Sequence, residues 1–473
     1  MKRVCMVIII ITVVFTGSYG TYADTSDPFD YARAVYEYIL ENYFGEIDEN
    51  MLAENLIRAI AESLDRYSVF LTVEEAGEFF KNMSGEYEGI GITYHLTAEG
   101  HRIVSVMRGS PAEKAGILPG DIIYSVNGSN VRMLNSEELG MLIKGPEGEP
   151  VTVHIYRKSQ ETLIEFTMIR EKIKISTVSF RLIDKNTGYI GISAFNNETY
   201  NETKIAAEYF RKRGVRNIVL DLRDNGGGLV GQAVMVAGLF IPEGVVTKLV
   251  FENPGYPVMT YVSDLKEQIF DISVLVNENT ASAAELLAAA IQERGAGRLV
   301  GTVTFGKGIF QTGQYIASYE AYQKYFAVVG IEITMEETGG YLHMTSGRYL
   351  TPLGNDINGS GIIPDVVIIN AGYETDIKSI DRMTDGFGYH AGSDEVIRMN
   401  AEAVLGLLGY YTGKTGATPA DEFTVALSEF QRDNGIGETG TLNYITRRML
   451  DYHLGILSME RDAQLKEALS LLD

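Results

Sequence analysis

Apolar residues in the first part of the chain recur at helical spacing. Between residues 24 and 84 they return every three to four positions, which predicts amphipathic helices. Two stripes carry this pattern: Ala32, Val35, Tyr36, Ile39, Leu40 and Tyr43 form the first, and Leu52, Leu56, Ile60 and Leu64 form the second. Both stripes are most simply packing faces, and both are long enough to hold a partner subunit.

The pattern changes to short strands and turns over residues 85–170. A glycine-rich segment, residues 85–92, leads into the first strand, and Val126-Asn127-Gly128 signals a tight turn. Residues 108–123 combine a short capped helix with a Pro-Gly turn. Residues 151–156 alternate between apolar and polar, as a half-buried strand does. This region is therefore predicted to be a small β-rich domain.

Strands and helices alternate over residues 171–370, which favours a largely parallel or mixed sheet covered by helices. The expected strands are residues 189–193, 217–222 and 272–276, and the expected helices are residues 202–213, 229–240 and 283–293. Residues 371–394 are polar and contain glycine, which predicts a linker. A small helical domain is expected over 395–455 and an amphipathic tail helix over 456–473. The fold class is multidomain α/β.

The N-terminus has the pattern of a targeting segment. Lys2 and Arg3 precede an apolar run over residues 4–15, and small residues follow up to Ala23. This order is typical of a secretory signal, and the run is shorter than the ~20 residues that a spanning helix needs. We predict a signal peptide over residues 1–23. An uncleaved anchor and a buried N-terminal strand are the alternatives. The mature protein is expected to work outside the cytoplasm.

Composition narrows the function classes. The 473 residues carry a formal net charge of −23, spread along the chain, which argues against a nucleic-acid partner. The single cysteine, Cys5, lies in the predicted signal, so a disulfide framework and a multi-cysteine zinc site are excluded. The metal-binding spacing His-Glu-x-x-His is also missing. We expect no metal and no organic cofactor.

Two short stretches carry a candidate nucleophile and base. Ser282 lies between a predicted strand and an alanine-rich helix, where a hydroxyl meets unpaired backbone N–H groups. Taken alone, it is more commonly a helix N-cap. Lys307 lies among glycines and apolar residues, and burial there could lower its pKa enough to leave a neutral amine. Read as a strand, the segment puts Lys307 and Gln311 on one face. A solvated strand lysine is the ordinary alternative.

A third stretch, residues 221–228, reads Asp-Leu-Arg-Asp-Asn-Gly-Gly-Gly and joins a strand to a helix. Its glycines allow backbone N–H groups to approach an anion, although a plain tight turn has the same pattern. A phosphate loop is disfavoured because Gly-Lys-Ser/Thr is absent from this loop. Only one histidine, His343, lies in the predicted core, and no Gly-x-Ser-x-Gly elbow is present. A hydrolase here would need another base, and Ser-Lys is a known variant.

Together these stretches resemble the C-terminal processing peptidases, Ser-Lys serine peptidases of family S41. Ser282, Lys307 and Gln311, spaced by 25 and then four residues, match the family's nucleophile, base and assisting glutamine. Residues 348–352 and 361–365 resemble its closing strands. The resemblance implies a crotonase/ClpP-like α/β peptidase core over 171–370 and a PDZ domain over 85–170.

The resemblance also implies roles for backbone groups and for the C-terminal part. Its oxyanion hole would use backbone N–H groups of Ala283, Gly227 and Gly228, and its PDZ carboxylate-binding loop would be Gly89, Ile90, Gly91 and Ile92. Residues 395–455 resemble a peptidoglycan-binding helical module through the segments 407–411, 430–435 and 439–442. Two departures stand out: Gly226 replaces a common proline, and residues 318–345 are longer than usual.

The sequence thus predicts an exported serine endopeptidase that cleaves protein substrates near their C-termini. The PDZ domain would capture the substrate and gate the site. Expected partners are peptide C-termini, with peptidoglycan as a candidate ligand and a homodimer formed through the N-terminal helices. Secretion, or attachment to a bacterial membrane or cell wall, is expected. The alternatives are a non-catalytic PDZ and cell-wall scaffold, and a serine acyltransferase or esterase.

Overall fold

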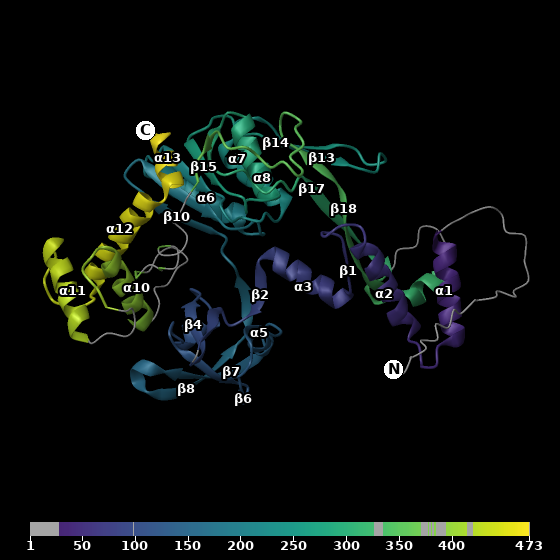
Figure 1. Cartoon of the computed structure of the whole chain (residues 1–473), viewed down its shortest axis with the longest axis horizontal. Helices are drawn as coiled ribbons and strands as arrows, with labels where there is room; N and C mark the ends of the chain where they lie inside the picture. Colours follow the sequence, from purple (N-terminus) through teal and green to yellow (C-terminus); the bar gives the residue numbers. More distant parts are fainter. Residues whose placement is uncertain are drawn as a thin grey trace, which may run out of the picture.

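The computed structural model describes residues 28–97, 99–325, 334–369, 377, 380, 383–384, 394–413 and 420–472. The predicted signal peptide and most of the predicted linker lie outside these ranges. Figure 1 shows the α/β core above the β-rich domain, with the N-terminal helices on one side and the C-terminal helices on the other. Among the helices described, none is long and apolar enough to cross a membrane.

The N-terminal region is not purely helical. It contains α1 (Pro28–Asn42), α2 (Glu49–Glu62), a short strand β1 (Val69–Leu71) and α3 (Val73–Ser84). The expected helical region is present, and β1 is an addition that its sequence pattern did not indicate. Three residues are too few to show a strand period, and β1 finds its partner far along the chain, where Phe70 pairs with Leu342. The Thr72 capping box starts α3, and Gly85 ends it at φ 73°.

The β-rich domain has its own hydrophobic core, which includes Ile103, Ile123 and Val153. Its main sheet has the order β3-β4-β5-β7-β8, with β6 paired to β5. The strands are β3 (Ile92–Thr97), β4 (Gly100–Val106), β5 (Ile122–Val126), β6 (Ser129–Asn130), β7 (Pro150–Arg157) and β8 (Thr162–Ile169), and the helices are α4 (Pro111–Ala115) and α5 (Ser136–Ile143). One consequence matters for binding: β3 is an edge strand.

The α/β core is built on a six-stranded sheet of order β10-β11-β12-β15-β16-β19. All neighbours are parallel except β10 and β11, so the predicted largely parallel sheet is present. Its strands are β10 (Val178–Leu182), β11 (Thr187–Ile192), β12 (Asn217–Asp221), β15 (Asp271–Val276), β16 (Gly297–Gly301) and β19 (Val366–Val367). Its helices are α6 (Thr199–Lys212), α7 (Val230–Phe240) and α8 (Ala283–Glu293), and they bury a large apolar cluster against it.

A second sheet and a two-stranded link complete this half of the molecule. The sheet contains β13 (Gly244–Phe251), β14 (Met259–Ser263), β17 (Ile309–Ala317), β18 (Thr338–Leu350) and β1. Strands β17 and β18 form a long antiparallel pair, with α9 (Tyr319–Tyr325) beyond β17, and residues 338–345 of the long segment belong to β18. Strands β2 (Glu86–Gly89) and β9 (Glu171–Lys174) pair with each other at the junction with the β-rich domain.

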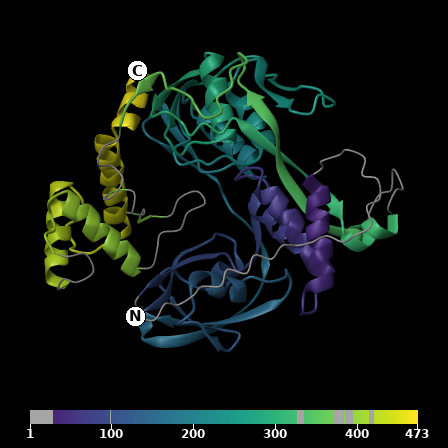
Figure 2. The ribbon, with the colours of Figure 1, turned by 45° about the vertical axis from the view of Figure 1, so that its right-hand side comes forward.

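The C-terminal helices are α10 (Asp394–Leu407), α11 (Ala420–Asp433), α12 (Tyr444–Arg461) and α13 (Ala463–Ser470). The predicted boundary between 455 and 456 is wrong, because α12 continues unbroken to Arg461 and Asp462 caps α13. In Figure 2, α12 runs from α13 at the core to α10 and α11. Leu465 and Ala468 of α13 pack on the core sheet, and buried Asp462 pairs with Arg223 at 2.8 Å.

Candidate active site

Ser282 starts helix α8 with an unusual backbone. Its φ is 58° and its ψ is −119°, a conformation that costs a residue with a side chain about 1–3 kcal/mol. A Cβ on Gly227 would lie only 2.8 Å from the Ser282 Cβ, so only glycine fits there. Ser282 therefore lies at the N-terminal end of the buried helix α8, and the glycine loop packs directly against it.

Lys307 lies in the turn before β17 rather than on the strand, because β17 begins at Ile309. The pairing register also shifts between Phe310 and Gln311. The expectation that Lys307 and Gln311 share a strand face by simple alternation is therefore wrong. The Gln311 amide donates to Thr345 Oγ1 at 3.1 Å.

The Lys307 amine has an environment that favours its neutral form. Burial lowers the pKa of Lys307, the positive charge of Arg66 lowers it further, and Asp65 opposes both. Its Nζ lies over the ring of Tyr67, 4.2 Å from the centroid. Within the described chain Nζ makes no hydrogen bond to Ser282 Oγ. The lysine is therefore near the serine segment but is turned toward Tyr67.

A buried carboxylate joins the two candidate residues. Glu285 is 0% exposed, and its Oε2 accepts the backbone N–H groups of Ser282 and Lys307, both at 2.8 Å. Its Oε1 accepts Thr304 Oγ1 at 2.6 Å and Gly306 N–H at 2.7 Å. Residues 25 positions apart in the sequence are thus fixed to the same oxygen atom. Sequence reasoning missed this role, since a glutamate three residues after a serine resembles an ordinary capping box.

A buried tyrosine makes a second link between the same two segments. The Tyr349 hydroxyl donates to the carbonyl of Ser282 at 3.0 Å and to the carbonyl of Lys307. The pKa of Tyr349 is raised well above its ordinary value by burial, with nearby Glu285 adding to the effect, so the phenol stays a donor. Tyr349 belongs to the segment 348–352 that the sequence marks as a closing strand, but its bridging role has no sequence signal.

The glycine loop supplies backbone donors beside the serine. Gly227 N–H already donates to Asn225 Oδ1 at 2.8 Å. Neither Gly228 N–H nor Ala283 N–H has a hydrogen-bond partner among the residues that the structure describes. Of the three predicted oxyanion donors, the latter two are therefore available in this arrangement, while Gly227 holds the loop in shape.

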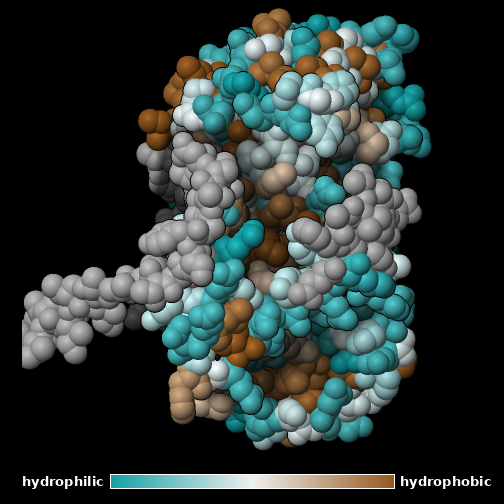
Figure 3. Space-filling model, turned by 90° about the vertical axis from the view of Figure 1, so that its right-hand side faces the viewer, coloured by the Kyte–Doolittle hydropathy of each residue, from teal (hydrophilic) through white to brown (hydrophobic). Residues whose placement is uncertain are grey.

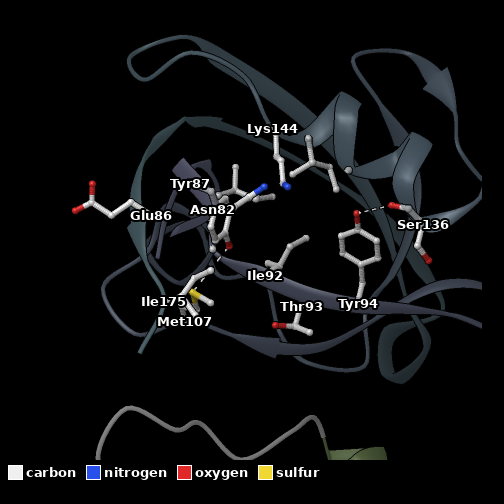
Figure 4. A pocket seen from close by; sticks show the side chains of 14 residues that line it. Asn82, Glu86, Tyr87, Ile92, Thr93, Tyr94, Met107, Ser136, Lys144 and Ile175 are labelled. Atoms are coloured by element: carbon white, nitrogen blue, oxygen red, sulfur yellow. Dashed lines mark hydrogen bonds between the residues drawn. The ribbon is translucent and has the colours of Figure 1, made fainter. Parts of the chain in front are cut away.

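The β-rich domain contains a groove of about 480 Å³ between edge strand β3 and helix α5. Ile90, Gly91 and Ile92 of the predicted carboxylate-binding loop line it, whereas Gly89 does not. Figure 4 shows Tyr87, Ile92, Tyr94 and Lys144 around this space, with the Tyr94 hydroxyl bonded to the Ser136 carbonyl at 3.0 Å. An edge strand beside a helix can accept an extended peptide as an added strand.

Comparisons with known proteins agree with this architecture. Residues 186–368 match the model of peptidase family S41, and residues 102–157 match that of the PDZ domain. The chain is 31% identical to the carboxy-terminal processing protease CtpA of Bacillus subtilis over 453 residues, 95% of this chain and 91% of that one. The chain belongs to peptidase family S41. It is also 28% identical over 484 residues to a probable CtpA-like serine protease of Staphylococcus saprophyticus, covering 99% and 93% of the two chains.

Among solved structures, the photosystem II D1 C-terminal processing protease is 25% identical and has a TM-score of 0.43, covering 77% of this chain and 92% of that one. The protein described here is thus a serine peptidase of the C-terminal processing type with a PDZ domain. Peptides are thus its substrate class. The expectation of an S41 peptidase core preceded by a PDZ domain is confirmed.

Replacing Glu285 by glutamine is expected to damage both stability and activity. Either orientation of the amide sets its NH₂ group against at least one backbone N–H, because both carboxylate oxygens accept such groups. An unsatisfied buried donor costs about 1–3 kcal/mol. A shift of Ser282 relative to Lys307 by ~1 Å lowers kcat/KM about 100-fold. Urea unfolding and peptide cleavage measure the two effects.

Glu293→Gln is the matched control for this prediction. Glu293 ends the same helix, is not buried, and also accepts two hydrogen bonds, from Leu353 N–H and the Asn355 amide. This variant should keep near wild-type kcat/KM. If Glu285→Gln and Glu293→Gln cleave peptides equally fast, Glu285 does not hold the site together.

Proposed function

We propose that this protein is an exported endopeptidase that cleaves proteins near their C-termini, with Ser282 as nucleophile and Lys307 as general base. The observation that carries the proposal is the shared hydrogen-bonding of Ser282 and Lys307 N–H groups to Glu285 Oε2, both at 2.8 Å. Ser-Lys chemistry needs a hydroxyl and an amine with a lowered pKa, and the Ser282 hydroxyl at the N-terminal end of α8 and the Lys307 amine are such groups.

The proposed reaction begins with a turn of the Lys307 side chain from Tyr67 toward Ser282. The neutral amine takes the proton of Ser282 Oγ, and Oγ attacks the carbonyl carbon of the peptide bond. Backbone N–H groups of Gly228 and Ala283 stabilise the oxyanion, and each such donor contributes about 3 kcal/mol. The Lys307 ammonium then returns the proton to the leaving amine. Water, deprotonated by Lys307, then attacks the acyl carbon, and the Lys307 ammonium returns that proton to Ser282 Oγ as the ester bond breaks.

Gln311 is proposed to act as the assisting residue by orienting Lys307 once the amine has turned. In the resting arrangement its amide donates to Thr345 instead. Release of that bond, or a water bridge, would bring Gln311 into the role that the family resemblance implies. Gly227 is proposed to shape the oxyanion loop, because its N–H group donates to Asn225 Oδ1 and is not free to donate to the oxyanion.

The PDZ groove is proposed to capture the substrate's C-terminus and to gate the site. An extended peptide would pair with edge strand β3, and its carboxylate would meet N–H groups of the loop Gly89–Ile92. Gly91 adopts φ 77° in this loop and packs on Ser110, which supports a backbone shape that points N–H groups toward the groove. The groove lies next to the β2–β9 pair that joins the PDZ domain to the core. A peptide bound in the groove would therefore act on this pair and, through it, on the core.

Capture of a free C-terminus predicts sensitivity to amidation. A substrate peptide with a C-terminal carboxylate is expected to be cleaved with a kcat/KM about 10- to 100-fold above its C-terminal amide, the range for a lost hydrogen bond to a charged group. Steady-state cleavage of the two peptides measures the ratio. Acetylating the other end of the peptide is the control and should change nothing. Equal rates for acid and amide would remove the carboxylate-binding role.

Export and association are proposed from separate features. The pattern over residues 1–23 supports export and a secreted or wall-associated location. Large apolar side chains on α1 and α2 and in the connection between them, such as Tyr31, Met51 and Phe44, are more than half exposed, which supports a homodimer through this face. Figure 3 shows the molecule from this side, with hydrophobic residues gathered in a hollow near its centre.

The C-terminal helices are proposed to bind peptidoglycan, on the basis of the segments 407–411, 430–435 and 439–442. Gln431 within them is fully buried and fastens the loop that follows α11, since it accepts Thr439 N–H and Gly440 N–H and donates to Thr446 Oγ1. Within this motif, Gln431 therefore stabilises the fold rather than facing a ligand. A ligand would use the more exposed residues around it.

A further inference from the structure

A turn from the N-terminal region forms one wall around Lys307. Residues Asp65, Arg66, Tyr67 and Ser68 connect α2 to β1. The Asp65 carboxylate accepts Tyr67 N–H at 2.8 Å and Ser68 Oγ at 3.2 Å. Although burial alone would raise the pKa of Asp65, hydrogen bonds from the Tyr67 backbone, Thr345 and Ser68 lower it, so the carboxylate remains charged and the turn keeps its shape.

The turn is fixed to the strand that carries the partner of Gln311. Thr345 N–H donates to Ser68 Oγ at 3.1 Å, and Thr345 Oγ1 accepts the Gln311 amide at 3.1 Å. The neighbouring β1 pairs Val69 with His343 on the same strand. Ser68 is buried, at 4% exposure. The turn therefore has a defined position relative to Gln311 and cannot shift without disturbing β18.

The Lys307 amine and the Arg66 guanidinium both lie near the Tyr67 ring. Lys307 Nζ lies 4.2 Å from the centroid of the Tyr67 ring, well within the ~6 Å range of cation–π contacts. The Arg66 guanidinium lies 4.7 Å from the same centroid and 5.3 Å from that of Phe305. A lysine side chain is long and flexible, so a ring at its tip limits where the amine can go.

We propose that Tyr67 and Arg66 are positioning residues for catalysis: the Tyr67 ring holds the resting Lys307 amine in one shielded position from which it turns to Ser282, and Arg66 places a second positive charge against the same ring. This inference rests on the proposed Ser-Lys function and extends it to a segment that precedes the PDZ domain in the chain. The surroundings of the Lys307 amine would then be formed by two distant parts of the sequence, the 65–68 turn and strand β18.

The charged and polar groups around Lys307 determine in which direction its pKa moves when Tyr67 or Arg66 is replaced. The groups that face the side chain or the backbone of Lys307 are Asp65, Arg66 and Tyr67 of the turn, His343 on β18, Glu285 on α8, and Tyr349. Arg66 lowers the pKa of Lys307, whereas Asp65 raises it. Loss of Arg66 removes a repelling charge and moves the active pH range upward. Loss of the Tyr67 ring removes a cation–π contact with the ammonium but admits water to the amine, and because burial is the largest cause of the lowered pKa of Lys307, the net movement is also upward.

Tyr67→Ala is the first test. Its kcat/KM near neutral pH should fall about 10- to 100-fold, as for a misplaced catalytic group, and the midpoint of its pH–rate profile should move to higher pH. Tyr67→Phe keeps the ring face but removes the hydroxyl that accepts a hydrogen bond from Arg66, so it should retain the wild-type rate with a midpoint between those of the wild type and Arg66→Gln. Tyr444→Ala, an exposed tyrosine on α12, is the matched control and should change neither quantity.

Arg66→Gln is the second test, and it avoids any concern about folding because Arg66 is exposed. The midpoint of the pH–rate profile should move upward, while Arg211→Gln, an exposed arginine on α6, should leave it in place. Unchanged midpoints in both Tyr67→Ala and Arg66→Gln would overturn the inference while Ser282→Ala and Lys307→Met remain inactive. Full activity of Ser282→Ala would instead overturn the underlying Ser-Lys proposal.

Discussion

Ser282→Ala is expected to lower kcat/KM for peptide cleavage by a factor on the order of 10⁵ or more, the scale on which serine peptidases lose activity without their nucleophile. Alanine removes Oγ, the proposed nucleophile at the N-terminal end of α8. The backbone bond from residue 282 to Glu285 does not need the side chain, so the fold should remain intact. Cleavage rate and thermal melting measure the two parts of this expectation.

Ser282→Gly is a useful companion to Ser282→Ala. It is equally inactive in this account, but glycine adopts φ 58° without strain, so it should melt no lower than the alanine variant. Both proteins should still bind peptides through the PDZ groove. Cleavage by purified Ser282→Ala at the wild-type rate would contradict the assignment of the nucleophile.

Lys307→Met is expected to lower kcat/KM by a factor of about 10³–10⁴, the range for loss of a general base. Methionine resembles lysine in length and carries no amine, so it fits the half-buried site without acting as a base. In the wild-type enzyme the active, neutral amine becomes more populated as pH rises. Because burial and Arg66 lower the pKa of Lys307, the rate should rise and level off with a midpoint below the ~10.4 of a free lysine.

The matched control for Lys307→Met is Lys204→Met. Lys204 also lies over a tyrosine ring, that of Tyr200, at 5.9 Å, but on the surface helix α6. This variant should keep the wild-type rate and pH profile. If Lys307→Met retained substantial activity with an unchanged profile, the base would have to be another group.

The core of the fold was predictable because its elements are long and their patterns are strong. Helix α8 occupies the predicted residues 283–293, and the three expected strands of the sheet, β11, β12 and β15, lie within two residues of the expected positions. Ser282 and Lys307 could be proposed as a candidate pair, since a serine before an alanine-rich helix and a lysine among glycines form a specific combination. These features depend on local sequence, and local sequence is what pattern reasoning measures.

The contacts that join the site were not predictable in the same way. Glu285, Tyr349 and Tyr67 act through residues 22 to 240 positions away, and their own sequence surroundings suggest a cap, a strand and a loop. Strand β1 was missed because it is short and pairs only with β18. The α12 boundary was misplaced because nothing in residues 456–461 breaks a helix. The missed side-chain contacts and strand β1 depend on long-range contacts, which leave no local periodicity.

The most direct test of the Ser-Lys account is the rate at which a fluorophosphonate probe modifies Ser282, measured against pH in the wild-type enzyme and in Lys307→Met. Peptide mapping identifies the modified residue. The account predicts modification at Ser282, with a wild-type rate that rises with pH to a midpoint below ~10.4, and a rate at least ~100-fold lower and without that midpoint in Lys307→Met. Equal rates in the two proteins, or a midpoint near the ~6.5 of histidine that survives the substitution, would contradict it.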